Sequence, residues 1–304
     1  MPQPAPSRNV LGVALIVASA CCFGSLAIFG RFGYRLGLTL PQLLSYRFLL
    51  AAILLWIAVA VRARGLPPRR SLAGLIVMGA AGYVGQSAAY FSALRYIPAS
   101  TTALLLYTYP VVVTLLAALL FRESLGRTKV AAVGIAFLGT MLVVGVQLRV
   151  AAPIGILLGL ASAACYSGYI LYGSRLLVGI PPVSATATIM TAAAVVWLGY
   201  AGATRQLPVP LTLQRVTLIV GFVLIATAIP ILFFIVGLQL IGPSRAAILS
   251  TFEPATTVLL AVLILGEGAN PIQYVGGALI LASVLVLEGT GWRASRVLAQ
   301  ATRE

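Results

Sequence analysis

The residues that could do chemistry in this chain are a few polar and aromatic side chains inside long apolar stretches. Gln86 lies between Tyr83 and Tyr90, at a spacing that places the three side chains on one face of a helix. Such a face could stack on an aromatic ring and hydrogen-bond to an amino or carboxylate group. The alternative is a packing role, in which Gln86 only bonds to a neighbouring helix.

Glu253 is the only acidic residue expected near the middle of an apolar stretch. An ionisable side chain there costs about 2.5–3.5 kcal/mol, so it should face protein or water. One hypothesis is proton coupling, in which Glu253 takes up a proton on one side of a membrane and releases it on the other. The alternative is a neutral acid hydrogen-bonded to a neighbouring helix.

Three prolines fall well inside apolar stretches: Pro110, Pro230 and Pro254. A proline lacks the N–H that would bond to the carbonyl four residues earlier, so each proline should kink its helix. The freed carbonyls could contact a substrate or act at a hinge. A static kink is the alternative, because proline is tolerated in membrane helices.

Four more residues are expected to contact a substrate: Tyr107, Tyr166, Ser250 and Phe252. The rings would pack on an apolar group, and Ser250 would help to hold the polar end. Tyr109, two residues beyond Tyr107, should point elsewhere on a regular helix. For each ring, ordinary packing with a locally satisfied hydroxyl is the alternative.

The composition indicates an integral membrane protein. Of the 304 residues 61% are hydrophobic and only 8% are charged, which is too apolar for a soluble fold of this size. The chain has neither His nor Asp, which excludes Ser-His-Asp triads, His-based zinc sites and aspartyl dyads. Cys21, Cys22 and Cys165 lie in apolar stretches and are expected to be unpaired thiols. No cofactor and no metal is expected.

Ten apolar stretches are long enough for transmembrane helices, which need about 20 residues each. They are 9–34, 41–61, 71–96, 98–121, 126–147, 153–177, 182–203, 212–240, 243–265 and 270–289. The predicted fold is therefore an all-α membrane protein with ten transmembrane helices. It forms a single membrane domain, 1–304, with polar tails at 1–8 and 290–304.

The basic residues indicate the orientation. The net charge of +15 would suggest nucleic acid as a partner of a soluble protein, but here the basic residues lie mostly between apolar runs. Thirteen Lys and Arg residues fall on the side of the termini and six on the other, which predicts cytoplasmic termini in the cytoplasmic (inner) membrane. Arg47 is left inside the second stretch. It could bind Glu253 or a substrate carboxylate, or extend to the membrane surface, and a structural role is preferred.

The sequence contains an internal repeat. Pro110 and Pro254 are 144 positions apart, and so are Glu123 and Glu267. The repeats cover 9–147 and 153–289 with five spans each, so the second runs inverted to the first. Inverted repeats are typical of secondary transporters with a site near the bilayer midplane. The two glutamates are expected to anchor the N-terminal amides of the helix that follows each of them.

The ten spans, the stretch SYRFLLAAILL (Ser45–Leu55) and the proline-then-glutamate pattern of spans four and nine carry a family resemblance. Together they resemble the EamA-type branch of the drug/metabolite transporter superfamily. This resemblance implies a 5+5 inverted-repeat carrier, usually an exporter of small metabolites, with spans five and ten at the periphery. Within the branch, the chain is most similar to the YddG-type exporters, which favour aromatic and other hydrophobic amino acids.

The expected function is therefore that of a secondary transporter, not an enzyme. It would export small organic metabolites, most of all aromatic or hydrophobic amino acids, by alternating access around a midplane cavity. Another metabolite or drug class is the first alternative. A channel is disfavoured because the polar residues are isolated, and an intramembrane enzyme because the usual catalytic groups are missing. The expected partners are the small-molecule substrate and the lipid bilayer, with no nucleic acid, and the oligomeric state is left open.

Overall fold

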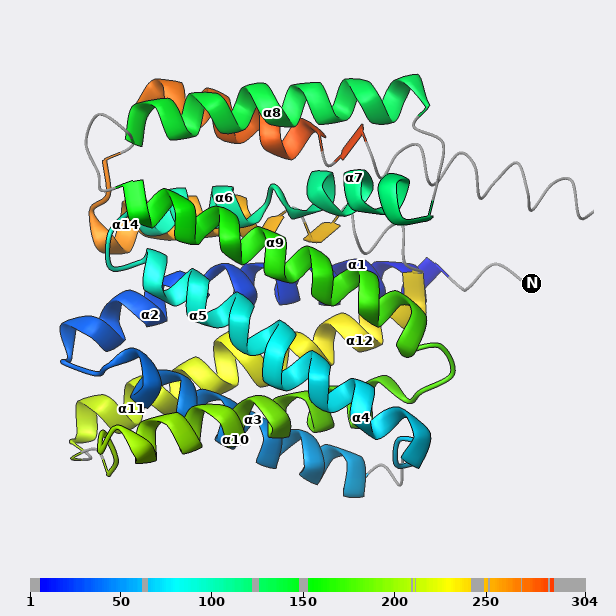
Figure 1. Cartoon of the computed structure of the whole chain (residues 1–304), viewed down its shortest axis with the longest axis vertical. Helices are drawn as coiled ribbons and strands as arrows, with labels where there is room; N and C mark the ends of the chain where they lie inside the picture. The colour runs from blue at the N-terminus through cyan, green and yellow to red at the C-terminus, as the bar shows by residue number, and fades with distance from the viewer. Residues whose placement is uncertain are drawn as a thin grey trace, which may run out of the picture.

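The computed structural model describes residues 6–61, 65–121, 126–147, 153–208, 210, 212–241, 249–250, 252–268, 270–283 and 285–286. Within these ranges the chain forms helices and no strand. The helices run side by side along a common direction in one bundle (Figure 1). Six of them are long and apolar enough to cross a membrane.

The bounds of the helices follow the apolar stretches of the sequence. The first half contains α1 (Pro6–Gly24), α2 (Leu26–Arg35), α3 (Leu40–Val61), α4 (Arg69–Val77), the π-helix η1 (Met78–Tyr83), α5 (Val84–Ala93), α6 (Ala99–Leu106), α7 (Tyr109–Phe121) and α8 (Arg127–Gln147). The second half contains α9 (Pro153–Leu176), α10 (Pro182–Ala203), α11 (Leu213–Val223), the π-helix η2 (Leu224–Ala228), α12 (Ile229–Ile241), α14 (Phe252–Leu265) and a last helix, Pro271–Ser283.

Each predicted span contains one of these helices or a consecutive set of them. Four of the spans are represented by shorter apolar helices: Ala99–Val113, Val130–Leu142, Phe252–Leu265 and Pro271–Ser283. The helix that contains Val130–Leu142 is α8, whose 21 residues, Arg127–Gln147, are enough for a bilayer crossing. The count of ten transmembrane helices stays a prediction.

The helices of the two halves pair in a pattern that respects the repeat. Helix α1 packs on α12 and α5 packs on α9, while α3 pairs with α10 and α6 with α14. Two hydrogen bonds show that the two halves pack in equivalent ways. Ser19 Oγ donates to the Pro230 carbonyl at 2.7 Å, and Ser162 Oγ donates to the Gln86 carbonyl at 3.3 Å. Both serines and both acceptors occupy matching repeat positions, so the first and eighth spans meet as the sixth and third do.

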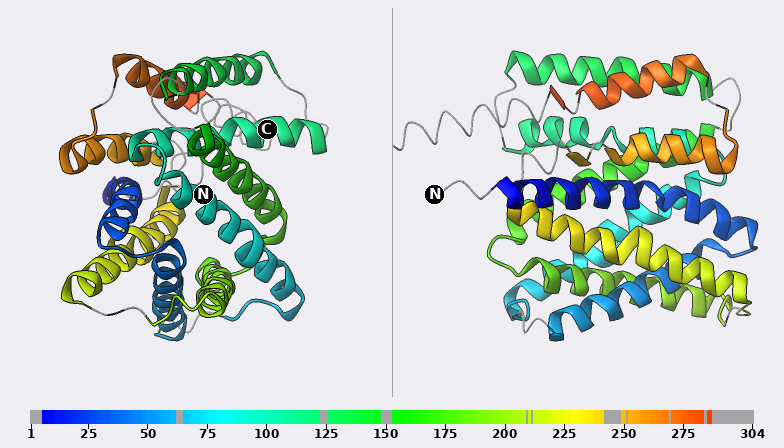
Figure 2. Two further views of the ribbon diagram at one scale, coloured as in Figure 1. Left: turned by 60° about the vertical axis from the view of Figure 1, so that its left-hand side comes forward. Right: turned by 180° about the vertical axis from the view of Figure 1, so that it is seen from behind.

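The last helices of the two halves lie at the edge of the bundle. Figure 2 shows α8 and the helix Pro271–Ser283 side by side and apart from the other helices. They approach closely because both present glycine: a Cβ added at Gly139 would lie 2.6 Å from the Gly276 carbonyl oxygen. Small residues allow such contacts between membrane helices.

The three prolines lie at different kinds of irregularity. Before Pro110 the helix breaks, with Tyr107 and Thr108 forming the turn between α6 and α7. Before Pro230 the helix widens into η2, in which hydrogen bonds run to the fifth residue instead of the fourth. Pro254 lies in the first turn of α14, where a missing N–H costs little.

Candidate functional site

Five tyrosines form a continuous row between the two halves of the protein. The ring centroids lie 5.8 Å apart for Tyr83 and Tyr169, 5.9 Å for Tyr169 and Tyr166, 4.8 Å for Tyr166 and Tyr109, and 5.7 Å for Tyr109 and Tyr107. All four separations are in the range at which aromatic rings attract one another. We call these five residues the tyrosine row.

The row ends on Glu253. The Tyr107 hydroxyl lies 2.8 Å from Glu253 Oε2 and 3.2 Å from the Ser250 carbonyl oxygen. Tyr107 closes α6 in the first half, and Glu253 lies in the first turn of α14 in the second. This pair therefore joins the two repeats at the position where the sequence places its midplane acid.

A break in the helix explains how both Tyr107 and Tyr109 join the row. Tyr107 donates its N–H to the Ala103 carbonyl and ends α6, and α7 begins at Tyr109. The Thr108 side chain closes the turn with a 2.8 Å hydrogen bond to the Leu105 carbonyl. The expectation that Tyr109 points away from Tyr107 was wrong, because it assumed one regular helix through this segment.

Arg47 lies at the other end of the row. Its side chain is 2% exposed, its Nε donates to Thr227 Oγ1 at 3.1 Å, and Tyr83 is close enough to interact with it electrostatically. The guanidinium carbon also lies 5.1 Å from the ring centroid of Phe48, 5.6 Å from that of Phe91 and 5.0 Å from that of Phe222. Such cation–π contacts stabilise a guanidinium away from water.

This burial excludes the arrangement in which Arg47 extends to the membrane surface. Thr227 belongs to η2 and Tyr83 ends η1, so Arg47 is hydrogen-bonded to one π-helix and lies near the other. The two π-helices occupy equivalent places in the repeat. Arg47 thus holds the third and eighth spans together at one level of the bundle.

The other residues that were predicted to contact the substrate do not all lie in the tyrosine row. Gln86 Nε2 lies 3.4 Å from Ser162 Oγ on α9, the contact expected of a packing role. Tyr90 is buried against Phe91, with ring centroids 5.4 Å apart. Phe252 is 49% exposed. The structure therefore brings Tyr83, Tyr107 and Tyr166 together in the row and leaves Phe252 exposed. Tyr90 is not a member of the row but is near enough to Arg47 and Glu253 to interact with both electrostatically.

Tyr109 and Tyr169 were not among the substrate contacts predicted from the sequence. Tyr169 follows Tyr166 by three residues on α9, a spacing that keeps both rings on one helical face. That spacing was visible in the sequence. Tyr109 carried no such signal, because only the break before it brings its ring into the row.

Glu267 anchors helix α6 of the opposite repeat. Its carboxylate accepts hydrogen bonds from the backbone N–H groups of Ala99 at 2.7 Å and Ser100 at 3.1 Å, and from Ser100 Oγ at 2.9 Å. A carboxylate at a helix N-terminus satisfies free N–H groups and interacts favourably with the helix dipole. Arg31 Nη2 adds an ion pair at 3.9 Å.

The expectation that Glu267 anchors the helix directly after it was therefore wrong. Beyond α14 the chain turns at Gly266, which has a φ of 67°. After this turn the carboxylate bonds to α6 rather than to the start of Pro271–Ser283. The repeat partner Glu123 lies outside the described residues.

A cavity of about 1150 Å³ lies at the end of the bundle opposite the amino terminus. It is bordered by the last turns of α2, α5 and α10 and by the segments that begin α3 and α6. Because Arg31, Arg35 and Arg95 line it, we call it the arginine cavity. In the described part of the chain, none of the predicted substrate contacts lines this cavity. It is thus separate from the tyrosine row.

The side chains of the tyrosine row and its two ends can bind a ligand. No group of three or more metal-ligating side chains occurs in the described ranges, and Cys21, Cys22 and Cys165 are free thiols. The tyrosine row offers aromatic faces, hydroxyl groups, one carboxyl group and one guanidinium. Such a set can hold an amphipathic organic molecule.

The sequence matches the model of the EamA-like transporter family twice, over residues 10–145 and 153–288. One match falls in each half of the chain, as a duplicated fold requires.

Individual proteins show the same similarity. An archaeal protein from Archaeoglobus fulgidus, named as an uncharacterized transporter, is 30% identical over 288 residues, which cover 93% of this chain and 96% of that protein. The transporter YcbK of Bacillus subtilis, also named as uncharacterized, is 28% identical over 278 residues, 87% of this chain and 88% of the relative. A solved crystal structure matches with a TM-score of 0.61 at 22% identity, over 92% of this chain and 96% of its own, and supports the fold alone.

Proposed function

Since this chain belongs to the EamA-like transporter family and is a multi-pass membrane transporter, we propose that it exports aromatic and other hydrophobic amino acids. The observation that carries this proposal is the tyrosine row with Arg47 at one end and Glu253 at the other. Its aromatic faces suit an apolar side chain. An amino acid could bind at either end of the row, because the guanidinium attracts its carboxylate and the Glu253 carboxylate attracts its ammonium group. It would bind one end at a time, since both of its charged groups are on one carbon.

The composition of the row supports an alternating-access mechanism for this export. Tyr83, Tyr107 and Tyr109 come from the first half, whereas Tyr166 and Tyr169 come from the second. A rocking of one half against the other would separate the rings and the Tyr107–Glu253 pair, which opens the row to a substrate. The closed contacts would re-form when the substrate leaves. This is the motion expected of inverted-repeat carriers with a site between the repeats.

Ten transmembrane helices place both termini on one side, and the excess of basic residues puts that side in the cytoplasm. The protein would then lie in the cytoplasmic membrane and move substrate outward. Glu253 is the candidate for proton coupling, because it is the only acid at the row among the described residues.

The test is transport by the purified protein in proteoliposomes. A panel of amino acids, nucleosides and sugars is measured for uptake and efflux, with and without a pH gradient. We expect saturable flux of phenylalanine, tryptophan and leucine, with counter-substrate stimulation that a channel would not show. Flux of another metabolite class with no amino acid moving would overturn the substrate assignment and leave the family membership intact.

A matched pair of variants tests whether the row is the site. Tyr166 contacts two rings of the row, whereas Tyr172, on the same helix, is 47% exposed. Loss of about 1 kcal/mol of ring contact corresponds to roughly a fivefold change in affinity. We expect Tyr166→Leu to raise the KM for phenylalanine at least fivefold and Tyr172→Leu to leave it within twofold. Equal effects of the two changes would place the site elsewhere.

A further inference from the structure

The charges of the arginine cavity are unbalanced in the described part of the chain. Three arginines line it, and Glu267 is its acid. Glu267 is already occupied by two backbone N–H groups, the Ser100 hydroxyl and Arg31. The structure gives neither Arg35 nor Arg95 an acidic partner among the described residues. The cavity therefore presents positive charge that its own wall does not neutralise.

Two buried donors in the wall of the cavity lack a partner. Arg31 Nε and Trp197 Nε1 are buried and make no hydrogen bond within the described structure. A buried N–H without an acceptor costs about 1–3 kcal/mol. Both groups can only donate, and both are closed off from the cavity by neighbouring side chains, so a ligand that satisfies them must bring acceptor atoms and shift those side chains. A carboxylate is such a ligand, and the charge of the cavity favours it.

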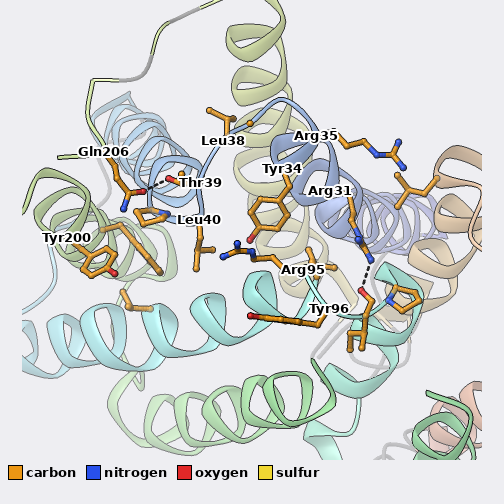
Figure 3. A pocket seen from close by; sticks show the side chains of 18 of the residues that line it. Arg31, Tyr34, Arg35, Leu38, Thr39, Leu40, Arg95, Tyr96, Tyr200 and Gln206 are labelled. Carbon is orange, nitrogen blue, oxygen red and sulfur yellow. Dashed lines mark hydrogen bonds between the residues drawn. The ribbon is translucent and has the colours of Figure 1, made fainter. Parts of the chain in front are cut away.

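Aromatic rings complete the cavity. Tyr34, Tyr96, Trp197 and Tyr200 belong to the wall, and Trp197 and Tyr200 pack edge to face with their centroids 6.2 Å apart. Figure 3 shows the Arg95 side chain between Tyr34 and Leu40, with its guanidinium toward the Tyr34 hydroxyl. The volume of about 1150 Å³ admits a small metabolite. The wall thus combines cationic groups with apolar ring surfaces.

We infer that the arginine cavity is a second ligand site, which binds an organic carboxylate with an aromatic or aliphatic side group. The carboxylate lies against Arg95 and Arg31, and the side group packs on the tyrosines and Trp197. Because the cavity is at the end opposite the amino terminus, the ligand enters from that side of the membrane. The site does not require that amino acids are the transported substrate.

Equilibrium binding of radiolabelled phenylacetate to the full-length protein in lipid nanodiscs tests this inference. Phenylacetate has the ring and the carboxylate but no amino group, and phenethylamine is the cationic counterpart. We expect saturable phenylacetate binding, and any phenethylamine binding should be the same in Arg95→Gln as in the wild type, because an ammonium group would bind at Glu253 and not in the arginine cavity. Arg95→Gln should weaken phenylacetate binding at least tenfold, and Trp197→Phe, which removes the N–H and keeps a ring, severalfold.

Two control variants locate the bound molecule. Arg205 is an exposed arginine at the same end of the bundle and does not line the cavity, so Arg205→Gln should leave binding within twofold. Tyr107→Phe alters the tyrosine row and should also leave phenylacetate binding unchanged. Arg35→Gln gives a second test within the cavity if Arg95→Gln does not yield folded protein, judged by size-exclusion chromatography.

The inference fails if phenylacetate does not bind, if Arg95→Gln weakens phenethylamine binding as much as phenylacetate binding, or if Arg95→Gln and Arg205→Gln weaken phenylacetate binding equally. Binding that Tyr107→Phe abolishes and Arg95→Gln preserves would also overturn it, since the carboxylate would then lie at the tyrosine row. Absence of amino-acid flux with normal phenylacetate binding contradicts the proposed function alone. Normal flux without phenylacetate binding contradicts this inference alone.

Discussion

The Tyr107 hydroxyl and the Glu253 carboxyl group meet at 2.8 Å across the two repeats. Tyr107 ends α6 and Glu253 begins α14, so a single hydrogen bond couples two interrupted helices of opposite halves. A movement of one half against the other changes this contact directly. For this reason Glu253 is the residue at which a proton and a conformational change would be linked.

The change Glu253→Gln tests that link. Glutamine keeps an acceptor for Tyr107 but cannot take up or release a proton at neutral pH. We therefore expect substrate flux in proteoliposomes to persist and to lose its dependence on an imposed pH gradient. Tyr107→Phe is the comparison, since it keeps the acid and removes the donor, and its flux should still respond to the gradient. A Glu253→Gln protein that responds like the wild type would show that coupling lies elsewhere.

The contact between Arg47 and Thr227 predicts energetic coupling across 180 positions of the chain. Hydrogen bonds to charged groups contribute about 1.5–3 kcal/mol. A double-mutant cycle with Arg47→Met and Thr227→Val should give a coupling energy of that order in unfolding experiments. Arg35→Met is the control, because Arg35 is exposed with its guanidinium 5.5 Å from the Phe32 ring. Arg35→Met should lower the free energy of unfolding much less than Arg47→Met does. Additive effects of the Arg47 and Thr227 changes would contradict the structure.

The bonds of Glu267 to α6 predict a loss of stability when its side chain is removed. Glu267→Ala leaves two N–H groups at the start of α6 without their acceptor, and capping groups contribute about 0.5–2 kcal/mol each. We expect the Tm of the purified protein to fall by several degrees. Ser100→Ala removes only the hydroxyl donor to the same carboxylate and should cost less than half as much. If Ser100→Ala were the more damaging change, the carboxylate would not be the anchor.

Gly79 in η1 predicts a steric effect at the contact with α10. A Cβ added there would collide with the Ile189 carbonyl oxygen and would lie 2.8 Å from Ala192 Cβ. Overpacking of this kind costs about 1–3 kcal/mol, so Gly79→Ala should lower the Tm. Gly199 on α10 has nothing within 4 Å of an added Cβ. Gly199→Ala should be neutral or stabilising by up to about 1 kcal/mol. Equal Tm values for the two variants would argue against the close packing of η1 on α10.

The sequence by itself determined the class of the protein and the position of its helices. A chain that is 61% hydrophobic cannot bury its apolar surface in a soluble fold. Apolar runs of the length of a bilayer therefore mark the helices, and prolines mark several of their starts. The equal spacing of Pro110 to Pro254 and Glu123 to Glu267 revealed the repeat, because duplication preserves offsets whatever the fold.

The tertiary structure decided which side chains meet. Arg47 and Thr227 lie 180 positions apart, and Glu267 bonds to α6 rather than to the helix that follows it. The π-helices and the break before Tyr109 make side chains point in other directions than they would on a regular α-helix. Periodicity and composition report how a segment is buried, but partners across helices depend on crossing geometry and on local departures from the α-helix. Tyr109 joins the tyrosine row only through the break between α6 and α7.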